Sequence, residues 1–263
     1  MTKWKDKWAL ITGASAGIGR ALAEQLAAGG SHLVLTARRR ERLDELARKL
    51  SSAHGIKVEC FAADLEQPNA PADIFAFTEA KGITIDLLIN NAGFGAYGEF
   101  SKSDLSRQLG MVTVNCSAVV HLTHLYLAGM VERRRGDILI LASTASFQPV
   151  PYIGVYAATK AFDLFFAQAL AEEVGRHGVR VCALCPGSTE TEFRDVAGGD
   201  SWSERGIETP EKVARVGLEA LAAGKHYVIS GFKNRVGVEA QRIAPRSMVT
   251  SAAERLFRPK HLR

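Results

Sequence analysis

Short, nearly continuous apolar runs alternate along the chain with longer stretches in which apolar residues recur every three or four positions. The short runs are rich in Val, Ile and Leu, which is typical of strands buried on both faces. The longer stretches have the period of helices that bury one face. This alternation predicts an α/β fold with a Rossmann-like, doubly wound, seven-stranded parallel sheet flanked by helices. The predicted strands cover residues 8–13, 32–38, 57–65, 85–93, 137–143, 180–187 and 226–230, and the predicted helices cover 18–28, 41–51, 72–81, 105–133, 155–177 and 210–223.

Charge is distributed unevenly along the chain. The protein has 263 residues and a net charge of +5, yet residues 233–263 alone carry +6. We therefore expect one Rossmann-like domain over residues 1–232 and a basic C-terminal extension over 233–263, packed on the same domain or at a subunit interface. The extension is predicted to hold one or two helices, interrupted at Pro245 and Pro259.

The composition excludes several classes of protein. The chain is 47% hydrophobic and 23% charged, close to the average of folded proteins. No run approaches the roughly 18 apolar residues of a membrane span, and the first residues lack the apolar core of a secretory signal. Four cysteines are too few for a disulfide scaffold in a chain of this length. These features predict a reduced, cytoplasmic protein.

A glycine-rich loop joins the first predicted strand to the first predicted helix. It reads Thr12-Gly-Ala-Ser-Ala-Gly-Ile-Gly19. Glycines let the backbone turn tightly and approach a pyrophosphate, and the N-terminus of the next helix offers free N–H groups with partial positive charge. Glycines also mark ordinary turns, but the position between a strand and a helix favours a nucleotide site formed by Gly13, Gly17 and Gly19.

The second predicted strand ends without the acidic residue that binds the ribose 2′-hydroxyl of NAD. Thr36 and Ala37 stand at this point, and Arg38 and Arg39 follow. A guanidinium pairs well with a 2′-phosphate, so the sequence favours NADP over NAD. The alternative for Arg38 is a solvated basic turn at the start of the next helix, which is our expectation for residues 40–42.

Three residues near the middle of the chain suggest acid–base chemistry. Tyr156 and Lys160 are four positions apart in a predicted helix and share one face. A cation beside a tyrosine lowers the phenol pKa, which is about 10 in water. Such a pair can protonate a developing alkoxide or deprotonate an alcohol. Ser143 comes thirteen residues before Tyr156, at the end of the fifth predicted strand, where its hydroxyl could hold a substrate oxygen.

Together these motifs resemble those of the short-chain dehydrogenase/reductase family, in its NADP-preferring type. The resemblance covers residue 8 to about residue 190 and includes Asn90-Asn-Ala-Gly93 after the fourth strand. It implies that Tyr156 is the general acid/base and that Ser143 positions the substrate carbonyl. It also implies that Lys160 lowers the pKa of Tyr156 and holds the nicotinamide ribose, and that Asn115 supports a water relay to Lys160.

The same resemblance implies a cofactor site. Arg38 matches the position that NADP-dependent members use for the phosphate, whereas Ala16 stands where many of them carry a second basic residue. Arg38 and Arg39 would therefore have to provide the preference for NADP without help from a basic residue at position 16. The residues implied to bind the cofactor are Gly13, Ser15, Gly17, Ile18, Gly19, Arg38, Arg39, Asp64, Leu65, Asn91, Ala92, Gly93, Tyr156, Lys160, Pro186, Gly187 and Thr189.

Loops beyond the strand ends are expected to shape the substrate site. Their aromatic residues favour an apolar or aromatic carbonyl compound, although these side chains could also simply pack the loops. Charged residues at 190–195 are also compatible with a charged substrate. Residues 188–208 have the composition of a mobile lid. The aromatic candidates are Phe94, Tyr97, Phe100, Phe147, Tyr152, Phe193 and Trp202.

Some residues suggest partners and others only structure. Phe162, Phe165 and Phe166 could extend the core or form a subunit contact, and the resemblance favours the contact, hence a homodimer or homotetramer. The basic extension fits a solvated face, a subunit-interface arm, or a contact with an anionic membrane or acyl carrier. No motif supports nucleic-acid binding. No metal is expected, since His121 and His124 lack a third ligand.

Cys182 and Cys185 have the spacing of a redox pair, but they are predicted to lie on opposite faces of a strand and to be structural.

These observations predict an NADP(H)-dependent oxidoreductase that transfers a hydride between nicotinamide and a carbonyl or alcohol substrate, with Tyr156 as general acid/base. One alternative is an NAD-linked alcohol dehydrogenase, and another is a non-catalytic NADP-binding protein. A third keeps the fold and cofactor but catalyses epimerisation or dehydration. Neither the substrate nor the working direction follows from the sequence.

Overall fold

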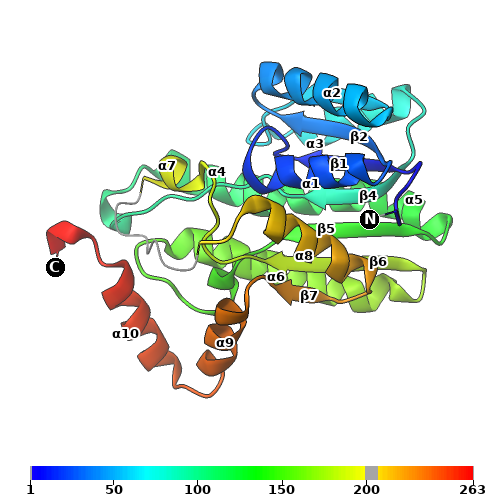
Figure 1. Ribbon diagram of the computed structural model, residues 1–263. Coiled ribbons are helices and arrows are strands. Elements are labelled where there is room, and N and C mark those ends of the chain that lie inside the picture. The colour runs from blue at the N-terminus through cyan, green and yellow to red at the C-terminus, as the bar shows by residue number, and fades with distance from the viewer. Residues whose placement is uncertain (1, 199–206, 263) are drawn as a thin grey trace.

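A seven-stranded parallel sheet forms the centre of the molecule, as Figure 1 shows for the computed structural model, which describes residues 2–198 and 207–262. The strand order is β3-β2-β1-β4-β5-β6-β7, so the predicted doubly wound fold is confirmed. Strand β4 is buried at every position, as the continuous apolar runs predicted. The strands are β1 (Trp8–Thr12), β2 (His32–Ala37), β3 (Val58–Ala62), β4 (Ile85–Asn90), β5 (Gly136–Leu141), β6 (Val179–Cys185) and β7 (Tyr227–Ile229).

Helices cover both faces of the sheet and bury two apolar cores. One core packs α1, α2 and α8 on one face, and the other packs α3, α5 and α6 on the opposite face. Helix α8 begins as its sequence predicts, with the Thr209 hydroxyl accepting a hydrogen bond from the N–H of Lys212 and Pro210 in the first turn. The helices are α1 (Gly17–Ala28), α2 (Arg40–His54), α3 (Ala70–Ala80), α4 (Leu105–Val112), α5 (Ala118–Glu132), α6 (Gly154–Gly175), α7 (Phe193–Ala197), α8 (Pro210–Ala222), α9 (Phe232–Gln241) and α10 (Arg246–Phe257).

The long predicted helix over 105–133 is interrupted by a π-helical turn. This turn, η2 (Thr113–Ser117), joins α4 to α5 without a break in the helical path. By length and composition alone, the stretch Leu105–Glu132 is apolar enough to cross a membrane. Leu122, Tyr126 and Met130 are buried in the core beside the sheet, as in the core helix of a globular domain.

The predicted strands run too far at their carboxyl ends. The strand predicted over 57–65 ends at Ala62, and the one predicted over 137–143 ends at Leu141. The remaining residues leave the sheet and form loops at its carboxyl edge. In a doubly wound sheet this edge holds the ligand, next to the point between β1 and β4 where the strand order reverses.

The C-terminal extension is helical and is interrupted near the two prolines. Helix α9 ends at Gln241, α10 starts after Pro245, and a 3₁₀ turn (Lys260–Leu262) follows Pro259. Figure 1 shows α10 projecting beyond the sheet and its helix layers. The division into a domain over 1–232 and an extension stays a prediction.

Candidate active site

The glycine-rich loop makes a tight turn between β1 and α1. Gly13 and Gly17 have positive φ angles of 67° and 54°, which favour glycine. A Cβ on Gly19 would lie only 2.4 Å from the carbonyl oxygen of Gly13. Asn91 fixes the loop from the end of β4, because its Nδ2 donates hydrogen bonds to the carbonyl oxygens of Thr12 (2.8 Å) and Gly13 (3.3 Å). The loop is therefore held open for a ligand that approaches its backbone.

The N-terminus of α1 points into the same space. Its N-cap residue is Ala16, which has no side-chain acceptor, and its first turn carries no acidic residue. The first N–H groups of the helix and its dipole thus favour an anion here. The glycine loop and this helix end fit the pyrophosphate of a dinucleotide.

Several arginines follow β2, near the glycine-rich loop. The Arg39 and Arg42 guanidinium groups both contact the Glu192 carboxylate, at 2.7 and 2.6 Å, while Arg38 lies 3.8 Å from Glu66. Arg39 also donates to the Ser15 hydroxyl in the glycine loop, at 3.1 Å. Arg42 is exposed, as the sequence analysis expected for a solvated turn, and one turn of α2 brings it beside Arg39, so that the two share the Glu192 carboxylate.

Ser143 and Tyr156 meet at the carboxyl end of β5. Ser143 follows the strand after Ala142 and caps the 3₁₀ turn η3 (Thr144–Phe147), its hydroxyl accepting from the N–H of Ala145 at 3.1 Å. Ser146 in that turn donates through its hydroxyl to the carbonyl oxygen of Lys160 at 2.7 Å. This bond ties the serine turn to the helix that carries Tyr156.

Lys160 is held by partners that the sequence analysis did not identify. Its Nζ donates to the carbonyl oxygen of Leu141 (2.6 Å) and to Oδ2 of Asp163 (2.9 Å). Burial alone would lower the pKa of Lys160, but attraction by Asp163 and Tyr156 outweighs burial and raises it. Lys160 is therefore cationic. The sequence feature that could have identified Asp163 as a partner of Lys160 is its position three residues later, on the same helix face.

Burial raises the pKa of Tyr156, because removing water disfavours the phenolate. The charge of Lys160 and a hydrogen bond with Ser143 act in the opposite direction, as the resemblance implied for Lys160, while the charge of Asp163 adds to the rise. Tyr156 is therefore a protonated phenol at neutral pH in this state.

The π-helical turn places Asn115 behind the site. Its side chain is fully buried, accepts from the N–H of Phe94 (3.2 Å), and donates to the carbonyl oxygen of Phe94 (3.1 Å) and the hydroxyl of Thr159 (3.0 Å). A Cβ on Gly93 would lie 3.0 Å from Asn115 Oδ1 and 3.3 Å from Lys160 Nζ. Asn115 thus links the loop after β4 to the helix of Lys160 and does not line the cavity.

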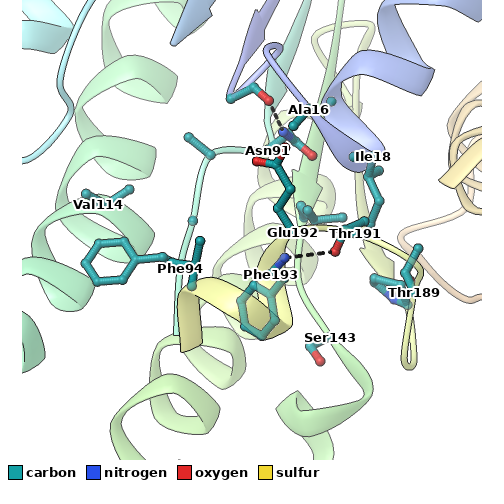
Figure 2. A pocket seen from close by; sticks show the side chains of 18 of the residues that line it. Ala16, Ile18, Asn91, Phe94, Val114, Ser143, Thr189, Thr191, Glu192 and Phe193 are labelled. Atoms are coloured by element: carbon teal, nitrogen blue, oxygen red, sulfur yellow. Dashed lines mark hydrogen bonds between the residues drawn. The ribbon is translucent and has the colours of Figure 1, made fainter. Parts of the chain in front are cut away.

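One cavity of about 490 Å³ joins these groups. Figure 2 shows Ala16 and Ile18 of the glycine loop on one side of it and Ser143 on the other. With the exception of Asn115, the structure places every candidate catalytic and cofactor residue on its wall: Gly13, Ser15, Gly17, Ile18, Gly19, Arg38, Arg39, Asp64, Leu65, Asn91, Ala92, Gly93, Ser143, Tyr156, Lys160, Pro186, Gly187 and Thr189.

The apolar wall differs from the one expected. Of the aromatic candidates, Phe94 and Phe193 line the cavity, and the Phe193 ring lies 5.1 Å from that of Tyr156. Leu256 and Phe257 also line it, although the sequence analysis gave the C-terminal extension no part in the substrate site.

The other aromatic candidates have different surroundings. Phe100 is exposed, Phe147 packs against Tyr227, and the Tyr152 hydroxyl donates to Glu254 at 2.8 Å. The Tyr97 hydroxyl donates to the carbonyl oxygen of Phe257 at 2.6 Å. Trp202 and much of the predicted lid over 188–208 lie outside the described residues.

The two cysteines of β6 pack in the cores on opposite faces of the sheet, as predicted, and are structural. Cys182 and Cys185 are free and buried in β6, and burial raises the pKa of Cys182 to about 12, so its thiol is not reactive. Within residues 2–198 and 207–262, no group of three His, Cys, Asp or Glu side chains could hold a metal ion.

Comparisons with known proteins identify the family. Residues 7–200 match the family model described as short chain dehydrogenase. A very-long-chain 3-oxoacyl-CoA reductase of Bos taurus is 34% identical over 229 residues, which cover 84% of this chain and 72% of that protein. A short-chain dehydrogenase from Sphingobium yanoikuyae, solved in complex with NADPH, is 31% identical with a TM-score of 0.83, covering 92% and 95% of the two chains.

The bulky-bulky ketone specific alcohol dehydrogenase from Comamonas testosteroni is 29% identical with a TM-score of 0.77, covering 90% of this chain and 92% of that one. The family match, the identities and the shared fold agree with the motifs around the cavity. The chain belongs to the short-chain dehydrogenase/reductase family and is an oxidoreductase.

Proposed function

We propose that the protein is an NADP(H)-dependent reductase of apolar carbonyl compounds, with Tyr156 as its general acid/base. The observation that carries the proposal is the shared cavity, which Ser143, Tyr156 and Lys160 line together with the glycine loop. A nicotinamide cofactor would supply and accept the hydride. The residues of this chain would bind it, orient the substrate and transfer the proton.

The proposed roles follow from the contacts. The Ser143 hydroxyl lies at the strand end next to Tyr156 and would hold the carbonyl oxygen of the substrate. Tyr156, whose raised pKa keeps the phenol protonated, would donate its proton to the developing alkoxide. Lys160 is fixed as a cation beside Tyr156 and would stabilise the phenolate left after proton transfer.

The preference for NADP(H) is proposed from the charges at the end of β2. Thr36 and Ala37 offer no carboxylate to a ribose 2′-hydroxyl, and the side chains of Arg38 and Arg39 line the cavity. The guanidinium of Arg39 contacts the carboxylate of Glu192, and a guanidinium that binds a carboxylate can also bind a phosphate. The NADPH complex of the similar Sphingobium enzyme supports this assignment.

An apolar substrate is proposed from the apolar side chains on the cavity wall. Phe94, Phe193, Leu256 and Phe257 line the cavity, and the Phe193 ring packs on that of Tyr156. Such walls bind apolar groups and leave orientation to a few polar atoms. The similar proteins are named for 3-oxoacyl-CoA and bulky ketone substrates, so we expect ketones with large apolar groups, acyl thioesters included, to be reduced best.

The experiment that tests the proposal compares wild type with Tyr156→Phe. NADPH binding is followed by fluorescence titration, and turnover by NADPH consumption with a panel of apolar ketones, aldehydes and acyl thioesters. We expect Tyr156→Phe to lose turnover by a factor of at least 10³ and to bind NADPH within about threefold of wild type. Retained turnover would contradict the role of Tyr156.

The same titration separates the alternatives. Equal affinity for NADH would support an NAD-linked dehydrogenase, while tight NADPH binding without oxidation of any substrate would support a non-catalytic protein. Product formation without net NADPH consumption would indicate epimerisation or dehydration.

We also propose a homo-oligomer. Exposed apolar side chains gather on the helices α4, α5 and α6, a pattern typical of interaction surfaces. Light scattering should give at least a dimer for wild type and a smaller species for Phe165→Glu, since that ring is 67% exposed. The exposed side chains are Leu105, Leu109, Val112, Val120, Phe162 and Phe165.

A further inference from the structure

The segment Thr191–Phe193 crosses the cavity from the glycine loop to Tyr156. Figure 2 shows the three side chains between Ile18 and Ser143. At one end, a Cβ on Gly17 would lie 2.9 Å from Cγ2 of Thr191. At the other end, the Phe193 ring packs on the ring of Tyr156, with 5.1 Å between the centroids. The segment therefore contacts both the glycine loop and Tyr156.

Glu192, in the middle of this segment, neutralises the arginines of the cofactor site. Its two carboxylate oxygens each contact one guanidinium, Oε2 that of Arg39 at 2.7 Å and Oε1 that of Arg42 at 2.6 Å. These two hydrogen bonds lower the pKa of Glu192, so it is ionised at neutral pH. An anionic side chain thus bridges the guanidinium groups of Arg39, which contacts Ser15, and Arg42.

The two arginines that hold this carboxylate are also chemically suited to hold a 2′-phosphate. Guanidinium groups bind phosphate and carboxylate oxygens with the same fork of N–H donors. Arg39 reaches the glycine loop through Ser15, so an anion bound to it also lies next to the nucleotide. A cofactor without the 2′-phosphate has no anionic group at this position to bind these arginines.

We propose that Glu192 is a determinant of cofactor selectivity, because its carboxylate competes with the 2′-phosphate of NADP(H) for Arg39 and Arg42. This inference rests on the proposed nicotinamide-cofactor site. It adds Arg42 to the residues that would bind the 2′-phosphate. It also assigns Glu192 a role in lowering the affinity for NADP(H) without changing the affinity for NAD(H). Removal of the carboxylate should therefore increase selectivity for NADP(H).

The test measures dissociation constants of NADPH and NADH by fluorescence titration for wild type, Glu192→Gln and the control Glu190→Gln. Glu190 is exposed and lies immediately before this segment, but it does not line the cavity. We expect Glu192→Gln to bind NADPH roughly three- to tenfold more tightly, the scale of exposed ion pairs, and NADH within about twofold of wild type. Glu190→Gln should leave both constants unchanged.

A second measurement isolates the phosphate subsite. Adenosine 2′,5′-bisphosphate and adenosine 5′-monophosphate serve as probes, followed by the shift in melting temperature. Glu192→Gln should increase the shift with the bisphosphate alone. This gain should vanish when Arg39→Ala and Arg42→Ala are also present, because the competing partners are then gone.

Failure of this inference differs from failure of the proposed function. If wild type prefers NADPH but Glu192→Gln leaves the preference unchanged, or changes both cofactors equally, Glu192 does not determine selectivity and the cofactor assignment stands. If no variant binds either dinucleotide, both the cofactor assignment and this inference are wrong.

Discussion

The Nζ atom of Lys160 lies 2.9 Å from Oδ2 of Asp163, in a place where the two residues are only 4% and 0% exposed. A buried ammonium without a partner would lose its proton, because burial disfavours the charged form. Asp163 keeps Lys160 charged, and at the same time its own charge opposes the effect of Lys160 on Tyr156. The pair therefore holds the lysine in place and moderates its effect on the phenol.

Asp163→Asn should shift the pH dependence of alcohol oxidation. Asparagine and the carbonyl oxygen of Leu141 would still accept hydrogen bonds from Lys160, so we expect the ammonium to stay protonated, while the negative charge that raises the pKa of Tyr156 is removed. Oxidation requires the phenolate, so the pH of half-maximal kcat/KM should fall by roughly 0.5–1 unit. The thiols of Cys116 and Cys185 also face the pair, but burial raises the pKa of each, that of Cys116 to about 11, so both stay neutral.

The control for this experiment is Asp73→Asn, an exposed aspartate on α3 far from the cavity. Its pH profile should coincide with that of wild type. A profile of Asp163→Asn that loses amplitude but keeps its midpoint would mean that Asp163 only supports the fold.

Asp163 should also leave a signature in the pH dependence of stability. Burial, partly offset by Lys160, raises its pKa from 3.8 to about 6. Between these values the folded state binds a proton that the unfolded state has released, so this contribution to stability falls as pH rises from about 4 to 6. Relative to Asp163→Asn, wild type should lose unfolding free energy across this window. Urea midpoints at several pH values measure the difference, and parallel curves for the two proteins would contradict the raised pKa.

Gly19→Ala should damage both stability and cofactor binding. The added Cβ would stand 2.4 Å from both Asn91 Nδ2 and the carbonyl oxygen of Gly13, so the glycine loop would have to move. We expect a loss of about 1–3 kcal/mol in unfolding free energy and at least tenfold weaker NADPH binding. Gly175→Ala is the matched control, since nothing lies within 4 Å of its added Cβ. Equal behaviour of the two variants would show that the loop accommodates a side chain.

Phe257→Ala should reduce activity toward bulky substrates while sparing the cofactor. The side chain lines the cavity, and its backbone carbonyl, which accepts the Tyr97 hydrogen bond, stays in place. Loss of this apolar contact should lower kcat/KM for large ketones by roughly tenfold. NADPH affinity should not change. The control Phe232→Ala removes an 82% exposed ring on α9, and a similar loss there would mean that the effect is not local to the cavity.

The fold could be predicted well from the sequence because hydrophobic periodicity and short motifs are both local features of the chain. Buried strands and one-sided helices have different periods, and the glycine loop and the Tyr156–Lys160 pair each lie within a short segment. Element ends were less accurate, since apolar residues continue past the sheet into the loops that line the cavity.

Contacts between distant segments could not be predicted in this way. An acid three residues after Lys160 ordinarily forms a solvated helix pair, and Asp163 is buried only because neighbouring elements cover it. Arg42 and Glu192 are 150 residues apart. Phe257 belongs to an extension whose charge suggested a surface role, although that helix presents an apolar side chain to the cavity.

The π-helical turn at Thr113–Ser117 makes the site sensitive to chain length as well as to residue type. A π turn contains one residue more than the α-helical turn it replaces. Deletion of a single residue there would let α4 and α5 join as one regular helix. It would also turn α4 by about 100° relative to α5 and remove Asn115 from Phe94. A more regular helix would then come at the expense of the contacts that Asn115 makes with Phe94 and Thr159.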